Sequence, residues 1–292
     1  MAKEFSFADL NKEMSKHSTY GETLDKSTIS EIDHYIPTGN WHLNACLTGS
    51  LFGGYPNNRA VALAGPSGTG KTYLILNAIK QAQAQGYSIV FYDSENAVDK
   101  TLVEKFGIDP TKFRYEPCNT VQEFRTSVTA ITDVLIEQKA KGIALPKIMV
   151  VLDSAGNLAT QKEIDDAKTG SSKADMTRAK LLKSTFRIIM TQFGICKIPF
   201  LFTNHTYQTQ DLFSRQVGGG GTGPEYAASI ILFLGKANRY LLPIVDKIFV
   251  SYKELEGIKD KYNKKIIKNN KHPLLNGKIC RRLNQAILIC IF

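Results

Sequence analysis

The sequence lacks the features that identify membrane and secreted proteins. No run reaches the roughly 18–20 uncharged apolar residues that a membrane-spanning helix needs, and Met1–Leu10 carries charges where a signal peptide is apolar. The cysteines form no CxxC pair and no metal-binding spacing, which argues against a zinc site or a disulfide framework and predicts reduced thiols. They are Cys46, Cys118, Cys196, Cys280 and Cys290. These absences predict a soluble, cytoplasmic protein that does not contact a membrane.

The main part of the chain also lacks an excess of basic residues. The net charge is +10, but residues 1–235 hold 24 Lys and Arg against 23 Asp and Glu. Residues 236–292 hold 13 against 4, so almost all of the positive charge lies in the last fifth of the chain. The overall charge therefore gives no support for nucleic-acid binding by residues 1–235.

Apolar runs alternate with helix-length segments from Trp41 onward, which predicts an α/β fold. Fully apolar strands of this kind are typical of a mainly parallel sheet with helices on both faces. The predicted strands are Ala60–Ala64, Ser88–Tyr92, Lys147–Leu152 and Pro199–Thr203. Lys71–Gln85 and Val121–Lys141 are long enough to be the crossover helices, and apolar residues spaced three or four apart predict an amphipathic helix over 174–195.

A phosphate-binding loop follows the first predicted strand. Gly65-Pro66-Ser67-Gly68-Thr69-Gly70-Lys71-Thr72 satisfies the G-x-x-x-x-G-K-[ST] pattern between a strand and a helix. The glycines let backbone N–H groups curl around phosphate oxygens at a helix N-terminus. Lys71 then neutralises the β- and γ-phosphates and Thr72 supplies a hydroxyl ligand to Mg²⁺, so the cofactors expected are ATP and Mg²⁺.

Two further strands end in acidic residues. Asp153 closes Ile148–Asp153 and is predicted to hold Mg²⁺ beside the phosphate loop, although an N-cap role is an alternative. No acid follows Asp153 until Glu163, so the base for hydrolysis must come from elsewhere. Glu95 follows the strand Ile89–Tyr92, at the edge where α/β sheets bind ligands, and can orient and deprotonate water; capping of the next segment is the alternative.

A long, glycine-rich connection extends from Asn204 to Tyr226. Loops of this length inside a compact domain indicate function or mobility. Arg215 and the backbone amides of Gly218, Gly219, Gly220 and Gly221 can contact a phosphate backbone, with Tyr207 and Phe213 available to the bases. A flexible linker is the alternative interpretation.

Taken together, these residues resemble the RecA superfamily, and most of all the UvsX-type recombinases of tailed phages. The resemblance covers about residues 36–234. It rests on the phosphate loop and on ordered blocks at 36–44 (IPTGNWHLN), 49–54 (GSLFGG), 92–95 (YDSE), 152–159 (LDSAGNLA), 175–180 (DMTRAK) and 203–207 (TNHTY). The implied fold is a RecA-like P-loop NTPase core.

The resemblance assigns roles to several residues. It implies that Glu95 is the catalytic carboxylate and that His205 stands where the family senses the γ-phosphate. It places two mobile DNA-binding loops at Thr160–Lys173 and His205–Thr222, so that Lys173 joins Arg215 as a predicted DNA contact. It also matches Asp99 to the adenine contact, whereas Leu102 stands where an aromatic residue usually stacks on the base.

The implied function is that of an ATP-dependent, single-stranded DNA-binding recombinase, a DNA-dependent ATPase that forms filaments for homologous recombination and DNA repair. Its partners would be single-stranded DNA, further copies of the chain, and single-strand-binding and loader proteins, in the cytoplasm of a bacterial host if a phage encodes it. The alternatives are a replicative hexameric DNA helicase, which forms closed rings; a regulatory RecA paralogue without strand exchange; and a kinase, whose turnover is indifferent to DNA.

Composition divides the chain into three predicted parts. Residues 1–35 form an oligomerisation arm, residues 36–235 the ATPase core, and residues 236–292 an atypical basic tail. Phe5–Ala8 resembles the Phe-x-x-Ala polymerisation motif of cellular relatives, although a chance match is the alternative. The tail is rich in Lys, Asn and Ile, whose codons are A/T-rich, so we expect a truncation or a shifted reading frame with poor hydrolysis; a phosphate-binding tail is the alternative.

Overall fold

The computed structural model describes residues 5–18, 20–21, 23–170, 177–208, 216–218, 227–235, 248–250 and 266–268. Several predicted DNA contacts lie outside the described residues, as does most of the predicted tail. They are Lys173, Arg215, Gly219, Gly220 and Gly221. Two short segments of the tail, β10 (Ile248–Val250) and β11 (Ile266–Lys268), pair in parallel with each other.

A six-stranded parallel sheet forms the centre of the molecule, in the order β5-β4-β6-β7-β3-β9. Its strands are β3 (Ala60–Gly65), β4 (Ser88–Asp93), β5 (Phe113–Pro117), β6 (Ile148–Asp153), β7 (Phe200–Gln208) and β9 (Ile230–Phe233). The short β8 (Gln216–Gly218) pairs antiparallel with the end of β7, and β1 (Tyr35–Ile36) pairs with β2 (Tyr55–Pro56) outside the sheet. The predicted fold class is therefore confirmed.

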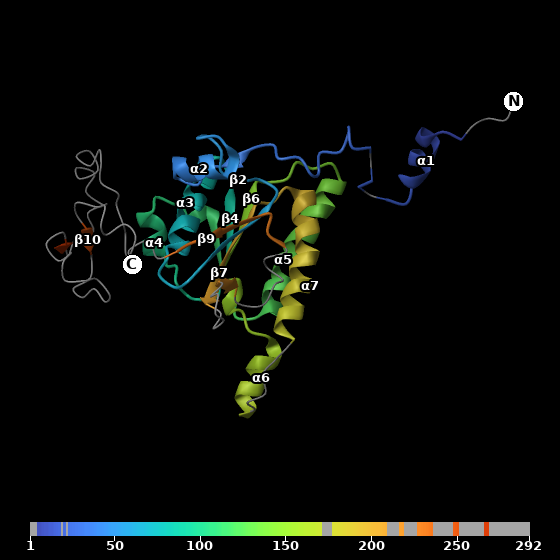
Figure 1. Cartoon of the computed structure of the whole chain (residues 1–292). Helices are drawn as coiled ribbons and strands as arrows, with labels where there is room; N and C mark the ends of the chain where they lie inside the picture. The colour runs from blue at the N-terminus through green and yellow to red at the C-terminus, as the bar shows by residue number, and fades with distance from the viewer. Residues whose placement is uncertain are drawn as a thin grey trace.

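Helices cover both faces of the sheet (Figure 1). On one face lie α3 (Lys71–Ala84) and α4 (Lys100–Lys105), and on the other α5 (Val121–Ala140) and α7 (Arg178–Cys196). The alternate residues of β3 pack into two apolar clusters: Ala60 and Ala62 face α5 and α7, whereas Val61 and Leu63 face α3. Burial of each large aliphatic side chain contributes about 1.5–3 kcal/mol, which is why these strands contain few polar residues.

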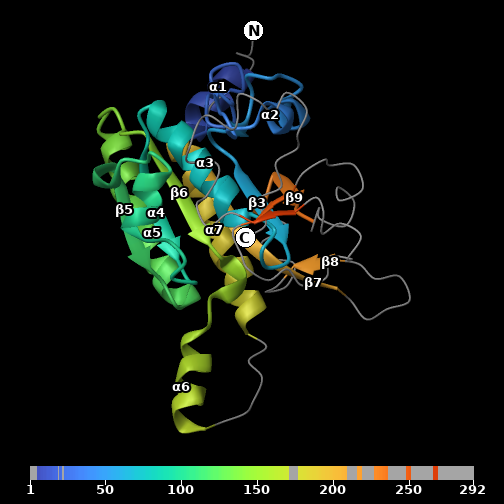
Figure 2. The ribbon, with the colours of Figure 1, turned by 90° about the vertical axis from the view of Figure 1, so that its left-hand side faces the viewer.

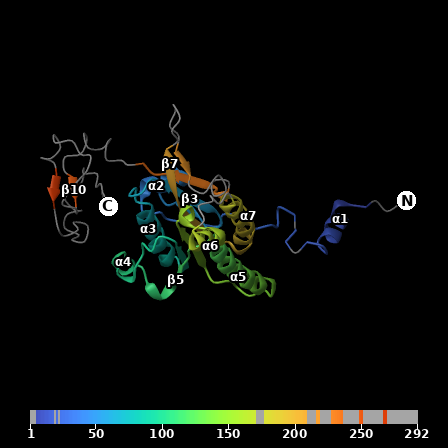
Figure 3. The ribbon, with the colours of Figure 1, turned by 90° about the horizontal axis from the view of Figure 1, so that it is seen from below.

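Three further helices lie outside the two layers that cover the sheet. The helix α2 (Trp41–Thr48) lies above α3, and α6 (Gln161–Thr169) extends below the sheet (Figure 2). The helix α1 (Phe7–Met14) lies apart from the rest of the ribbon, as Figure 3 also shows, and buries none of its residues. Residues 160–173, predicted as a loop, form the helix α6 over Gln161–Thr169, because Thr160 and Glu163 make a capping box at its start.

Strand register brings the predicted site residues to one edge of the sheet. Asp93 at the end of β4 lies beside Asp153 at the end of β6, and Gly65 at the end of β3 lies beside His205 on β7. Parallel strands place all of these carboxyl ends at the same edge, where open α/β sheets bind ligands. Among the described residues, no helix is both long and apolar enough to cross a membrane.

Candidate functional site: a nucleotide-binding cavity at the carboxyl edge of the sheet

The loop between β3 and α3 has the backbone conformation that its glycines permit. Gly68 and Gly70 adopt φ angles of 74° and 88°, in the left-handed region that other residues avoid. A Cβ atom on Gly65 would lie 2.5 Å from the carbonyl oxygen of Leu234, so the approach of the segment after β9 requires glycine there. The loop therefore turns directly into the N-terminus of α3, where helix N–H groups are available to an anion.

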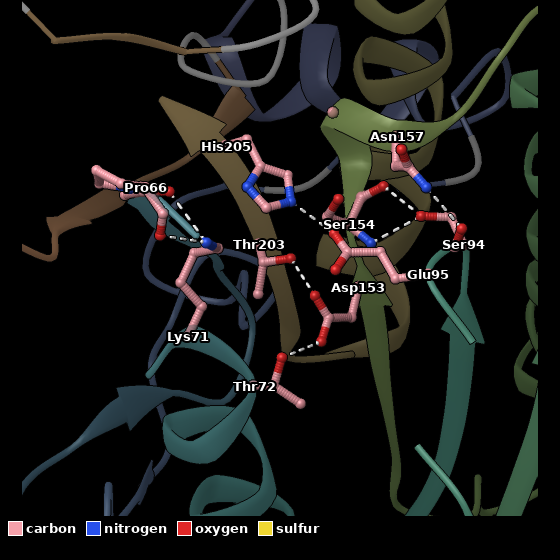
Figure 4. Close-up of polar contacts among 12 residues, drawn as sticks. Pro66, Lys71, Thr72, Ser94, Glu95, Asp153, Ser154, Asn157, Thr203 and His205 are labelled. Atoms are coloured by element: carbon pink, nitrogen blue, oxygen red, sulfur yellow. Dashed lines mark hydrogen bonds and ion pairs between the residues drawn. The ribbon is translucent and has the colours of Figure 1, made fainter. Parts of the chain in front are cut away.

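Lys71 lies inside this loop. Its Nζ atom donates to the carbonyl oxygens of Gly65 and Pro66, each at 3.0 Å (Figure 4). Burial lowers the pKa of the Lys71 ammonium, while the charges of Glu95 and Asp153 oppose that change. The side chain is thus held at the centre of the site, with two acidic residues as its electrostatic partners.

Asp153 is buried between two hydroxyl groups. Thr72 donates to its Oδ2 at 2.7 Å, and Thr203 on β7 donates to its Oδ1. Burial raises the pKa of the Asp153 carboxyl, and the charges of Glu95 and Asp93 add to this effect, whereas the two hydroxyls oppose it. The Asp153 carboxylate and the Thr72 hydroxyl together offer hard oxygen donors, which are the ligands that Mg²⁺ prefers. A bound cation would also offset the repulsion between Asp153 and the neighbouring acids, Glu95 and Asp93.

Glu95 pairs with His205 across the site. The Nε2 atom of His205 lies 2.7 Å from Oε1 of Glu95, and both side chains are partly exposed. Burial alone would raise the pKa of the Glu95 carboxyl, but the polar Ser154 and His205 and the charge of Lys71 outweigh it, so the pKa is lowered. Glu95 is therefore available as an ionised base next to the phosphate loop.

These residues line one cavity of about 260 Å³. Its walls are the phosphate loop, the acidic and histidine side chains, and an apolar group of which the sequence had singled out only Leu102. The lining consists of Ser67, Gly68, Thr69, Gly70, Lys71, Thr72, Tyr73, Leu76, Glu95, Leu102, Phe106, Asp153 and His205. The structure thus brings together Lys71, Thr72 and the three groups predicted from β4, β6 and β7. It does so through strand register and the packing of α3, neither of which is visible in local spacing.

The backbone around Glu95 is held by a hydrogen-bonded network that the sequence did not predict. The Ser94 hydroxyl donates to the carbonyl of Ser154 and accepts from its N–H, both at 2.9 Å, and the Asn157 amide donates to the carbonyl of Ser94 at 2.7 Å. The buried Asp93 accepts from the N–H groups of Glu95 and Val98. The segment that carries Glu95 is therefore fixed against the end of β6.

Asp99 lies elsewhere. Its carboxylate caps α4 by accepting from the N–H of Leu102 at 2.7 Å, and its side chain lines a separate cavity between α4 and β5. The adenine contact proposed for Asp99 stays a prediction, and in this structure the carboxylate already has a structural partner. Of the predicted DNA contacts, Gly218 ends β8 and pairs with Thr206.

The fold and this site define a P-loop nucleotide-binding protein of the RecA type, and comparison with known proteins agrees. Residues 2–237 match the family model described as the RecA N-terminal domain, so the chain belongs to the RecA family. That match confirms the resemblance found in the sequence.

Individual relatives point the same way. The chain is 36% identical over 233 residues to the "Recombination and repair protein" of Enterobacteria phage T4. The aligned region covers 78% of this chain and 58% of that protein. It is 28% identical over 231 residues to "Protein RecA" of Paenarthrobacter aurescens, covering 78% of this chain and 61% of that protein. A third relative, "Protein RecA" of Lactobacillus delbrueckii subsp. bulgaricus, is 29% identical over 245 residues, or 82% and 70% of the two chains. The chain thus spans about three fifths of the length of the first two relatives.

Proposed function

We propose that this protein is an ATP-dependent recombinase that binds single-stranded DNA and forms filaments in recombination and repair. The observation that carries the proposal is the convergence of Lys71, Thr72, Asp153, Glu95 and His205 on one cavity, in a chain of the RecA family. The names of its relatives, a recombination and repair protein and RecA proteins, support the same role.

The residues of the cavity suit hydrolysis of a nucleoside triphosphate. The loop amides and Lys71 would hold the phosphates, and Thr72 and Asp153 would hold Mg²⁺. A bound Mg²⁺ would neutralise charge on the phosphate oxygens. Glu95, kept ionised by its surroundings, accepts a proton from water, and His205 holds the Glu95 carboxylate through its ring nitrogen. We expect slow turnover, because residues 236–292, predicted to be an atypical basic tail, hold 13 Lys and Arg against 4 Asp and Glu and differ in composition from the rest of the chain.

DNA would bind at the carboxyl edge, near the segments that continue from the site. His205 lies on β7, whose end pairs with β8, and α6 projects from the same edge after β6. The helix α6 carries both acidic and basic residues and buries none of them. Backbone contacts, together with the predicted Lys173 and Arg215, would hold DNA without sequence preference, so affinity should fall with added salt.

Filament formation would use the N-terminal arm. Phe7, Leu10 and Met14 recur at spacings of three and four on α1, which forms an exposed apolar face with no partner among the described residues of this chain. A second copy would cover it in a head-to-tail contact that does not close. Within the predicted arm, residues 1–35, the part free to reach a second copy would lie before residue 29, because Asn58 and Arg59 donate hydrogen bonds to the carbonyls of Ile29 and Ser30 and attach them to the core.

Nucleotide-dependent DNA binding tests this function. We expect the 292-residue chain to bind a fluorescent oligo-dT in the presence of a non-hydrolysable ATP analogue at least tenfold more tightly than without nucleotide, and negative-stain images to show helical filaments. Lys71→Ala should remove the nucleotide effect. Closed rings would instead indicate a hexameric helicase, and nucleotide binding that is indifferent to DNA would contradict a role in recombination.

A further inference from the structure

The nucleotide cavity has an apolar end that the catalytic residues do not account for. Tyr73, Leu76, Leu102 and Phe106 line it together with the phosphate loop. Leu76 is buried in the core, whereas Tyr73 is 37% exposed. These side chains come from the first turns of α3 and from α4 with its C-terminal cap, two helices on the same face of the sheet.

Two of these residues form an aromatic pair. The ring centroids of Tyr73 and Phe106 lie 5.5 Å apart, and the ring planes make an angle of 66° in an edge-to-face arrangement. Phe106 packs against the apolar cluster beneath α3, which fixes its ring, and it holds the Tyr73 ring in turn. Tyr73 directly follows Thr72, and the pair lines the same cavity as the phosphate loop, so a ligand whose phosphates occupied the loop would have this pair within the same cavity.

The same end offers few groups that distinguish one base from another. Apart from the phosphate loop, the described side chains that line it are those of Tyr73, Leu76, Leu102 and Phe106, and of these four only Tyr73 carries a polar atom. The Asp99 carboxylate is bonded to the N–H of Leu102 and lines the other cavity, and Leu102 itself presents an aliphatic surface. An apolar site of this kind discriminates weakly between similar ligands, whereas a site built to form hydrogen bonds rejects the wrong ligand by roughly 10⁴-fold or more.

We propose that Tyr73 and Phe106 form the surface on which the nucleotide base stacks, so that the site accepts purine nucleoside triphosphates with little selection between adenine and guanine. Stacking tolerates different bases because every base has an aromatic face. The proposal rests on the proposed nucleotide-binding function and adds the residues that contact the base and the breadth of substrate that follows.

Three ligands separate the contribution of the base from that of the phosphates: AMPPNP, GMPPNP and inorganic tripolyphosphate, titrated against the full chain with Mg²⁺. We expect the Kd values of AMPPNP and GMPPNP to agree within about tenfold. Tyr73→Ser should weaken both by about tenfold and leave the Kd of tripolyphosphate unchanged, because it removes the aromatic ring on which the base would stack. Tyr73→Phe, which keeps the ring, should bind all three like the parent.

A second variant tests the same prediction at a different position, so that misfolding caused by Tyr73→Ser alone cannot decide the result. Phe106→Leu keeps an apolar side chain in the core but removes the ring, and it should likewise weaken both nucleotides without changing tripolyphosphate binding. Any one of three results would overturn the inference. The first is a preference of the parent for AMPPNP over GMPPNP of more than 100-fold. The others are an equal weakening of tripolyphosphate binding by Tyr73→Ser, and parent-like nucleotide affinity in both Tyr73→Ser and Phe106→Leu. If the parent binds none of the three ligands, the nucleotide site itself is wrong, and the inference falls with it.

Discussion

Nε2 of His205 on β7 lies 2.7 Å from Oε1 of Glu95, which follows β4, although 110 residues separate the two in the sequence. The contact joins the proposed base for hydrolysis to the strand that continues toward β8. Any movement of the β7 end that displaces His205 will therefore change the surroundings of Glu95. If DNA binds near β8, as proposed above, this contact is a physical route by which it would influence nucleotide turnover.

Replacing His205 should uncouple DNA binding from turnover. In His205→Ala the link between β7 and Glu95 is lost, so we expect the stimulation of ATP hydrolysis by single-stranded DNA to fall about fivefold or more, the size of a modest coupling free energy. His205→Gln keeps a side chain that can hydrogen-bond to Glu95 and should retain most of the stimulation. Phosphate release with and without oligo-dT measures both. Normal stimulation in His205→Ala would remove this contact from the coupling route.

The contact between Thr72 and Asp153 predicts that these two residues bind the Mg²⁺ needed for ATP hydrolysis. Asp153→Asn keeps the shape of the side chain and a partner for each hydroxyl but removes the carboxylate charge, so half-maximal turnover should need about tenfold more Mg²⁺. Titration of Mg²⁺ into chelator-treated protein measures this. Asp99→Asn, which alters an acid outside the cavity, should behave like the parent. If Asp153→Asn and the parent show the same Mg²⁺ dependence, the metal is held elsewhere.

The stability of the folded protein should depend on the protonation of His34, which lies near the end of the predicted arm. Its Nε2 lies 2.7 Å from the Tyr87 hydroxyl, and burial together with the charges of Lys147 and Lys197 lowers the pKa of His34 below its ordinary value of 6.5, although Asp33 opposes this. Because the folded pKa is the lower one, unfolding takes up a proton between these two values. Stability is thus fully present above pH 6.5 and decreases as pH falls through 6.5 toward the folded pKa.

The measurement is thermal unfolding at pH 7.5 and pH 5.5. The Tm of the parent should fall on acidification by more than that of His34→Gln, which cannot titrate, with a difference on the order of 2 °C. An identical fall in both proteins would show that His34 does not contribute.

The apolar face of α1 should control assembly. Replacing Leu10 and Met14 together by serine removes two side chains whose burial against a neighbouring subunit would contribute about 1.5–3 kcal/mol each, so association should weaken more than tenfold. The matched control replaces Lys12 and Glu13 by serine on the same helix. Sedimentation with a nucleotide analogue and DNA compares the two, and AMPPNP binding should be unchanged in both. Equal assembly of the two double variants would exclude this face from the contact.

The fold could be predicted from the sequence wherever a strand is buried on both faces. The predicted runs that became β3, β4, β6 and the first part of β7 are mostly apolar, and each strand begins within two residues of its predicted start. β7 continues to Gln208, through polar residues predicted as the start of a loop. β5 was missed because Arg114 and Glu116 interrupt its apolar run at the sheet edge, where none of its side chains is fully buried.

The sequence predicted the members of the site, Lys71, Thr72, Asp153 and Glu95, better than it predicted the contacts among them. The phosphate loop from Gly65 to Thr72 is contiguous, so its pattern sufficed. The contact between His205 and Glu95, the network of Ser94 with Ser154, and the pair of Tyr73 with Phe106 all depend on which strands and helices become neighbours. No local spacing contains that information, and α6 was mistaken for a loop although Thr160 and Glu163 form a recognisable capping box.

The most direct measurement of the central claim is ATP hydrolysis by the 292-residue chain and by Glu95→Gln, each with and without single-stranded DNA. Removing a general base typically costs about 10²–10⁴ in rate, while the loop, Lys71 and Thr72 remain to bind nucleotide. We therefore predict that single-stranded DNA raises turnover in the parent, even if the absolute rate is low. We predict that Glu95→Gln binds AMPPNP with a Kd like that of the parent and shows at least 100-fold slower turnover. Equal turnover in the two proteins, or parent turnover that does not respond to DNA, would contradict a DNA-dependent ATPase centred on Glu95.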